Sequence, residues 1–206
     1  MAEDTLSERR RPARISSPAN LLGIARILAT PVVIALILIA GPGMGIAAFV
    51  LFCLAAFTDF LDGWVARARG EVSPLGVFMD LTADKVLVGG VLIAMVEVDL
   101  LPTWIVATIL VRELVIAGVR QMAASENVVI PARALGKAKT LTTLVGMAIL
   151  LLAYDATTGG PLATTGIGLP AQIVGGWVMV FATVLTVVSG WDYLRGALPL
   201  LRGEPG

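Results

Sequence analysis

Residues 59–85 read DFLDGWVARARGEVSPLGVFMDLTADK, two mostly apolar segments that each carry a pair of aspartates and are joined by a short polar link. Asp59 and Asp62 are three residues apart in the first segment, and Asp80 and Asp84 are four apart in the second. On a helix, each spacing places the pair on one face. The short link predicts an antiparallel helical hairpin, so we expect the four carboxylates to meet near one end of it.

The composition around this hairpin is that of a membrane protein. Of the 206 residues, 57% are hydrophobic and 15% are charged, and the mean hydropathy is +0.91. Soluble domains average about 45–50% apolar residues. The formal net charge of zero does not indicate a nucleic-acid partner. The chain has no histidine and one cysteine, Cys53, which excludes histidine-based zinc chemistry, an intrachain disulfide and a cysteine-cluster metal site.

Six segments are apolar over roughly the 20 residues that a helix needs to cross a bilayer core. They are 20–40, 45–67, 75–96, 102–122, 135–154 and 171–191. The sequence therefore predicts an all-α, polytopic membrane protein with six transmembrane helices in one membrane domain at 18–200. We expect a soluble N-terminal tail at 1–17, without a signal peptide, and a short C-terminal tail at 201–206.

Lys and Arg residues flank these segments on one side only. Of the fifteen in the chain, Arg26, Lys85 and Arg112 lie inside the segments. The other twelve lie in or beside the N-terminal tail, the second-to-third and fourth-to-fifth connections, and the C-terminal end. Cytoplasmic loops of membrane proteins carry such an excess, so both termini are expected in the cytoplasm.

The four aspartates need a compensating interaction, because an ionisable residue inside a span costs about 2.5–3.5 kcal/mol on insertion scales. Clustered carboxylates repel one another unless a cation joins them, and all-oxygen ligands select Mg²⁺ first and Mn²⁺ second. Four carboxylates exceed what one Mg²⁺ uses, which indicates two ions, an arrangement that commonly serves phosphate displacement. The alternatives are helix-end acids that face cytosolic water, and the ion site of a divalent-cation transporter.

Two glycines lie close to these aspartates in the sequence. Gly63 follows Asp62, and Gly76 precedes Asp80 by one helical turn. Glycine in a membrane helix usually serves close helix packing, and its missing side chain also leaves room for a nucleotide beside the ions. Arg67, one turn after Gly63, either contacts a phosphate of that nucleotide or anchors the helix at the cytoplasmic face.

The fixed residues of 59–85 resemble, at every position, the signature of the CDP-alcohol phosphotransferase family, D-x2-D-G-x2-A-R-x8-G-x3-D-x3-D. The resemblance implies six membrane helices with a cytosol-facing polar cavity, usually in a homodimer, in the bacterial inner membrane. It also implies two divalent ions held by the four aspartates, with Asp84 as the general base. The CDP-linked lipid would lie over Gly63 and Gly76, near Arg67 and near Asn20 of the first segment.

Members of this family share the CDP-linked lipid and differ in the acceptor alcohol, so acceptor contacts are expected outside the signature. RELVIAGVR at 112–120 and GKAKT at 136–140 resemble the bacterial members that use glycerol 3-phosphate. PANLLGIARILATP at 18–31 resembles their first helix, although Gly23 replaces the usual Thr, and Leu81 stands where Pro is common. The expected acceptor-phosphate pocket comprises Arg112, Arg120, Lys137 and Lys139.

The reaction expected from this resemblance transfers a phosphatidyl group from CDP-diacylglycerol to sn-glycerol 3-phosphate and yields phosphatidylglycerol phosphate and CMP. Inositol phosphate or phosphatidylglycerol as the acceptor is the nearest alternative. Taken singly, Arg120 and the two lysines are also explained as topology signals at helix ends.

Overall fold

The computed structural model describes residues 18–69, 74–125 and 134–201, with side chains at 21–58, 82–125 and 135–198. Its elements are α1 (Pro18–Ile39), α2 (Met44–Arg69), α3 (Pro74–Glu97), α4 (Thr103–Ser125), α5 (Ala134–Thr157), the short 3-10 helix η1 (Ala163–Thr165) and α6 (Gly168–Leu201). The described part of the chain contains no strand, so the all-α prediction is confirmed. The tails predicted at 1–17 and 201–206 lie outside the described residues, except that Leu201 ends α6.

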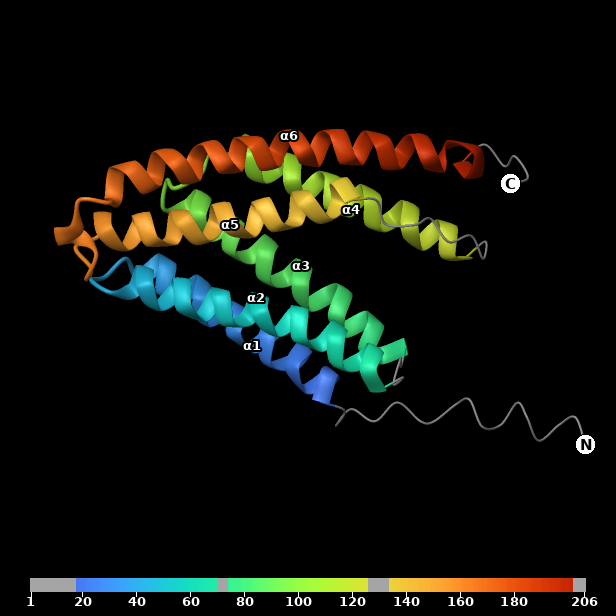
Figure 1. Cartoon of the computed structure of the whole chain (residues 1–206), viewed down its shortest axis with the longest axis horizontal. Helices are drawn as coiled ribbons and strands as arrows, with labels where there is room; N and C mark the ends of the chain where they lie inside the picture. Colours follow the sequence, from blue (N-terminus) through green and yellow to red (C-terminus); the bar gives the residue numbers. More distant parts are fainter. Residues whose placement is uncertain (1–17, 70–73, 126–133, 202–206) are drawn as a thin grey trace, which may run out of the picture.

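Helices α1 to α5 match the predicted segments within three residues at each end, whereas α6 continues ten residues past the predicted end at 191. Hydropathy predicts where an apolar segment ends, and a helix is free to continue beyond it. All six helices run along the length of the bundle (Figure 1). The start of α1 and the end of α6 lie at one end, and the connections 40–43, 98–102 and 158–167 lie at the other. The three connections without Lys or Arg thus share one end of the molecule.

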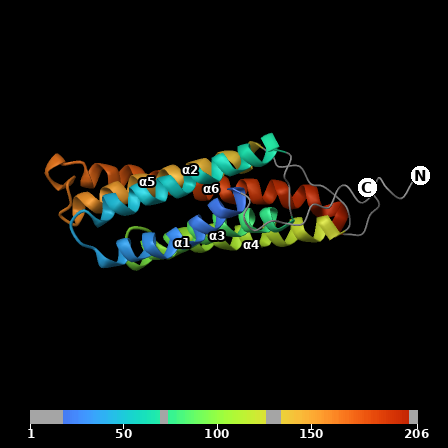
Figure 2. The same ribbon diagram turned by 90° about the horizontal axis from the view of Figure 1, so that it is seen from below.

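Helix α1 packs along both α2 and α3, whereas α2 and α3 touch each other only slightly (Figure 2). The short link correctly predicts an antiparallel pair, but it fixes only the distance between two helix ends. Gly90 allows α1 to approach α3 closely, because a Cβ atom there would lie 2.9 Å from Ile34 Cδ1 and 3.2 Å from Thr30 Cγ2. The separation of α2 and α3 is therefore set by a third helix.

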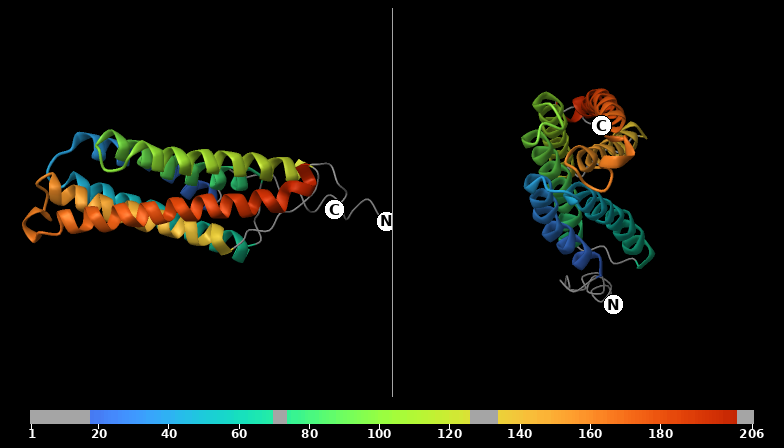
Figure 3. Two further views of the ribbon diagram at one scale, coloured as in Figure 1. Left: turned by 90° about the horizontal axis from the view of Figure 1, so that it is seen from above. Right: turned by 90° about the vertical axis from the view of Figure 1, so that its left-hand side faces the viewer.

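The remaining helices complete the bundle on the other side. α5 and α6 pack along each other, α4 lies against α6, and α2 lies against α5 (Figure 3). The buried apolar core occupies the half of the bundle nearest the 40–43, 98–102 and 158–167 connections. Its fully buried members include Ile37, Phe52, Leu92, Met95, Ile109, Met147, Leu150 and Met179.

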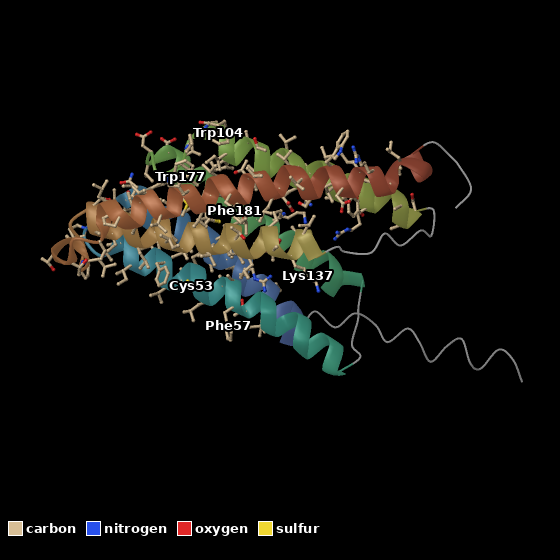
Figure 4. All side chains as sticks on the ribbon, turned by 45° about the horizontal axis from the view of Figure 1, so that its top comes forward. Cys53, Phe57, Trp104, Lys137, Trp177 and Phe181 are labelled. Atoms are coloured by element: carbon tan, nitrogen blue, oxygen red, sulfur yellow. The ribbon has the colours of Figure 1, made fainter. Side chains whose placement is uncertain are left out.

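Apolar side chains also cover the outside of the bundle. Phe57, Trp177 and Phe181 are each more than half exposed, and Figure 4 shows them on the outer surfaces of α2 and α6. Helices that are apolar on their outer faces suit lipid rather than water. Across the described residues, three stretches are long and apolar enough to cross a membrane: Leu21–Ile39, Leu135–Thr157 and Gly168–Leu198.

A buried aspartate fastens the core end of the bundle. Asp155, fully buried on α5, accepts hydrogen bonds from the backbone amides of Ile46 and Leu162, each at 3.1 Å. The amide of Ile46 lies in the first turn of α2, where helix amides have no partner within their own helix. Gly45 and Gly160 fit against Asp155 so closely that a Cβ atom at either position would overlap it. Asp155 therefore caps α2 and fixes the connection after α5 at the same time.

Candidate active site

The half of the bundle opposite the core contains a cavity of about 760 Å³ with walls from α2, α3, α4, α5 and α6. On the α2 side its wall is apolar and includes Phe52, Cys53 and Ala56. Figure 4 shows Lys137 at the beginning of α5, at the end of the bundle where α1 begins and α6 ends. The charged residues that line the cavity are Asp84, Lys85, Arg112, Glu113, Arg120, Lys137, Lys139 and Asp192.

Five residues predicted from the sequence thus line one cavity. Asp84 comes from α3, Arg112 and Arg120 come from α4, and Lys137 and Lys139 come from α5. Asp84 and Lys139 also line a smaller cavity between α3, α4 and α5. A predicted base therefore shares its surroundings with the predicted phosphate-binding cations.

Arg112 has a hydrogen-bonding position still open. Its Nη1 donates to Glu113 Oε1 at 3.0 Å, and its Nη2 donates to Ser189 Oγ of α6 at 3.2 Å. Its Nε is buried and has no hydrogen-bond partner. This Nε atom faces α6, because a Cβ atom on Gly190 would lie 3.4 Å from it. Arg112 also lines the cavity, so its guanidinium group is suited to bind a phosphate there.

Glu113 is a site residue that the sequence analysis missed. Its Oε1 atom accepts hydrogen bonds from both Arg112 Nη1 and Lys139 Nζ. The ion pair with Lys139 joins α4 to α5, and the ion pair with Arg112 lies within α4. The signal was present, because Glu113 is an acidic residue inside an apolar segment. The insertion cost that the sequence analysis applies to the four aspartates applies equally to Glu113.

Helix α6 also contributes polar residues that the sequence analysis did not select. Ser189, Asp192 and Tyr193 line the cavity. The guanidinium carbon of Arg120 lies 5.8 Å from the centre of the Tyr193 ring, a cation–π contact that holds the cation at the cavity wall. The Tyr193 hydroxyl is buried without a partner. The spacing of Ser189 and Tyr193, one helical turn apart, was the available signal.

The other predicted donor-site residues lie on the described helices, but their side chains are outside the described residues. Asp59, Asp62, Gly63 and Arg67 belong to α2, Gly76 and Asp80 belong to α3, and Asn20 belongs to α1. Among side chains that the structure does describe, no three acids, cysteines or histidines are grouped as a metal site. The proposed metal ligands therefore remain a prediction.

One contact of α1 lies directly before the first aspartate. Arg26 is 1% exposed, and its Nε donates to the backbone carbonyl of Ala55 at 3.2 Å. The Thr58 hydroxyl donates to the same carbonyl at 2.7 Å. Asp59 is the next residue of α2, so Arg26 joins α1 to α2 where the predicted metal site begins.

The six-helix bundle and its charged cavity agree with the comparison to known proteins. A family model described as CDP-alcohol phosphatidyltransferase matches residues 17–188, and the chain belongs to this family. This confirms the family predicted from residues 59–85.

Three bacterial proteins are similar in sequence to this chain over most of its length. The Bacillus subtilis protein named CDP-diacylglycerol--glycerol-3-phosphate 3-phosphatidyltransferase is 38% identical over 152 residues, 74% of each chain. A Rickettsia bellii protein of the same name is 35% identical over 179 residues, 85% of this chain and 92% of the relative. The Mycobacterium tuberculosis protein named probable phosphatidylglycerophosphate synthase is 34% identical over 194 residues, 93% of this chain and 86% of the relative.

Proposed function

We propose that this protein transfers the phosphatidyl group of CDP-diacylglycerol to sn-glycerol 3-phosphate, producing phosphatidylglycerol phosphate and CMP. Relatives that cover most of the chain are named for this transfer. The observation that carries the proposal is the cavity in which Asp84 lies beside cations of α4 and α5. An acid that accepts a proton and cations that hold a phosphate are what this reaction requires of the protein.

The bond changes follow from the two substrates. The primary hydroxyl oxygen of glycerol 3-phosphate attacks the phosphorus that bears the diacylglycerol. The bond from that phosphorus to the bridging oxygen of CMP breaks, and CMP leaves with this oxygen. Asp84 takes the hydroxyl proton. Positioning of the two substrates and neutralisation of their charge supply most of the rate enhancement in such transfers.

The acceptor phosphate binds to Arg112, Arg120, Lys137 and Lys139. The Arg112 guanidinium group has five N–H donors, of which Glu113 and Ser189 accept two, and the Lys139 ammonium group has three, of which Glu113 accepts one. Donors therefore remain for a dianionic phosphate group. Arg112 provides a planar fork for two phosphate oxygens, whereas the lysines act as point charges.

The donor lipid binds at α2 and α3. Asp59, Asp62, Asp80 and Asp84 would hold two Mg²⁺ ions, with Mn²⁺ as a substitute, because carboxylate oxygens are hard ligands. Bound there, the ions would neutralise charge on the pyrophosphate and on the leaving CMP. Asp84 fits this assignment, because its carboxylate lines the cavity. Gly63 and Gly76 leave space for the cytidine nucleotide, with Arg67 and Asn20 beside it.

We further propose that all six helices of the 18–200 domain span the bacterial inner membrane as a homodimer, with the cavity and both termini on the cytoplasmic side. Twelve Lys and Arg residues at one side of the predicted spans support this orientation. A divalent-cation transporter is the alternative from another class. The cavity argues against it, because Arg112, Lys139 and the other cations beside Asp84 would repel a permeating cation.

An acceptor panel tests the proposal. Purified protein in detergent is given CDP-diacylglycerol, Mg²⁺ and one acceptor at a time: glycerol 3-phosphate, inositol phosphate or phosphatidylglycerol. We expect CMP release and phosphatidylglycerol phosphate with glycerol 3-phosphate only. Release of CMP with another acceptor alone would retain the family and overturn the acceptor, and absence of CMP release with all three would favour the transporter.

A further inference from the structure

Glu113 lines the cavity, but the reaction described above assigns it no role. It lines the main cavity and also a smaller one of about 170 Å³ between α3, α4 and α5. Asp84 and Lys139 line the same two cavities. The Glu113 side chain is 27% exposed, so a ligand in the cavity can reach it.

The contacts of Glu113 hold it in one place and leave it able to accept another hydrogen bond. Arg112 and Lys139 both donate to its Oε1 atom. An ionised carboxylate has about four acceptor positions on its two oxygens, so these two ion pairs do not exhaust it. The four predicted phosphate-binding side chains, by contrast, are all arginine or lysine and only donate.

The chemistry of the acceptor calls for such a group. Glycerol 3-phosphate carries a phosphate at one end, a reacting hydroxyl at the other and a second hydroxyl between them. The phosphate needs donors, and the reacting hydroxyl needs a base. The middle hydroxyl needs an acceptor near both the base and the cations. Glu113 meets this requirement, because it contacts Arg112 and Lys139 and lines both cavities together with Asp84.

We propose that Glu113 is a specificity-determining residue whose carboxylate accepts a hydrogen bond from the non-reacting hydroxyl of the acceptor. It thereby selects phosphorylated polyols over phosphorylated simple alcohols. This inference rests on the proposed transfer to glycerol 3-phosphate. Asp192 is the other unassigned acid of the main cavity, but it does not line the smaller cavity that Asp84 and Glu113 share.

The experiment compares two acceptors that differ by this one hydroxyl. They are sn-glycerol 3-phosphate and 3-hydroxypropyl phosphate, which keeps the phosphate and the primary hydroxyl. The measured quantity is the ratio of kcat/KM for the two acceptors, at saturating CDP-diacylglycerol and Mg²⁺. For the wild-type protein we expect at least a roughly tenfold preference for glycerol 3-phosphate, the size of a hydrogen bond to a charged group.

Two substitutions of Glu113 then test whether its carboxylate binds the middle hydroxyl of the acceptor. Glu113→Ala should bring the ratio close to one. Glu113→Gln should leave an intermediate ratio, because the amide oxygen still accepts a hydrogen bond but carries no charge. Each ratio is measured within a single preparation, so it does not depend on the fraction of folded protein. Asp192→Ala is the matched control, and it should keep the wild-type ratio.

Several results would overturn the proposal. The first is a wild-type protein that shows no preference between the two acceptors. The second is a pair of Glu113 variants that keep the wild-type ratio while both kcat/KM values fall together. The third is a loss of preference in Asp192→Ala. The second result would reduce Glu113 to a support for Arg112 and Lys139. A wild-type protein that uses neither phosphate but transfers to another alcohol would overturn the proposed acceptor, and this inference with it.

Discussion

The carboxylate of Asp155 accepts a hydrogen bond from the backbone amide of Ile46 at 3.1 Å, although the two residues are 109 positions apart in the chain. Asp155→Ala removes this bond and the bond from the Leu162 amide, leaving both amides without their partner. Hydrogen bonds to charged groups contribute about 1.5–3 kcal/mol each. We expect a clearly lower Tm in detergent, with an unchanged glycerol 3-phosphate KM for the protein that remains folded. Asp99→Asn, at an exposed position at the same end, serves as the control and should keep the wild-type Tm.

Gly190 allows the Arg112 side chain to lie against α6. A Cβ atom at this position would lie 3.0 Å from Arg112 Cγ and 3.4 Å from Nε, so Gly190→Ala should displace the guanidinium by a few tenths of an ångström. We expect the glycerol 3-phosphate KM to rise severalfold and the CDP-diacylglycerol KM to stay constant. Gly176→Ala is the matched control on the same helix, because no atom lies within 4 Å of its added Cβ. Equal KM values for both variants would contradict the placement of Arg112.

The two arginines of α4 are expected to decide acceptor affinity. Arg112→Ala or Arg120→Ala should raise the glycerol 3-phosphate KM at least about tenfold, from the loss of a charge-assisted hydrogen bond. The CDP-diacylglycerol KM should change much less. Arg112→Lys should restore the affinity only in part, because lysine lacks the planar fork. Arg195→Ala is the control: Arg195 lies over the Trp191 ring at 5.0 Å and is not among the cavity-lining residues.

Substitutions of the aspartates of α2 and α3 should have two kinds of effect, one on turnover and one on the Mg²⁺ requirement. Asp84→Asn should abolish turnover while the protein still binds CDP-diacylglycerol, because the amide cannot take the hydroxyl proton. Asp62→Asn and Asp80→Asn should instead raise the Mg²⁺ concentration needed for half-maximal rate. The Mg²⁺ dependence of CMP release measures both effects. An unaltered Mg²⁺ response in both asparagine variants would contradict the assignment of these residues as ligands.

The two tyrosines of the chain offer a comparison of stability. The Tyr154 hydroxyl donates to the backbone carbonyl of Ile37 at 2.9 Å, whereas the Tyr193 hydroxyl is buried without a partner. Tyr154→Phe should therefore cost about 1 kcal/mol and lower the Tm. Tyr193→Phe should leave the Tm unchanged or raise it, since it removes an unsatisfied polar atom. Thermal unfolding without substrates measures both, and an equal decrease would show that the Tyr193 hydroxyl has a partner.

The sequence predicts the helices well, because each apolar segment is close to bilayer length and turn residues such as Gly43 end it. It also predicts that Asp84, Arg112 and Lys139 come together, since charged residues inside or beside spans gather where water or a ligand reaches them. Glu113 carries the same signal as an acid inside an apolar segment, but its ion pair with Arg112 is not predictable, because neighbours in a helix point in different directions and only the side-chain conformations bring the two together.

The sequence likewise does not predict contacts between distant parts of the chain. The bond from Ile46 to Asp155 joins helices whose positions relative to each other no local pattern specifies. The same is true of Ser189 of α6, which accepts a hydrogen bond from Arg112 although the two residues are 77 positions apart in the chain. The position of α1 between α2 and α3 belongs to this group, because a hairpin pattern contains no information about a third helix.

That position of α1 has a consequence for recognising enzymes of this kind in genomes. The packing of α2 and α3, which carry the predicted metal ligands, depends on a helix that lies outside the 59–85 signature and contributes none of its aspartates. A gene fragment that encodes the whole signature but begins after α1 would lack the helix that packs against both of them. An intact motif in such a truncated reading frame is therefore a sign of ancestry and not of activity.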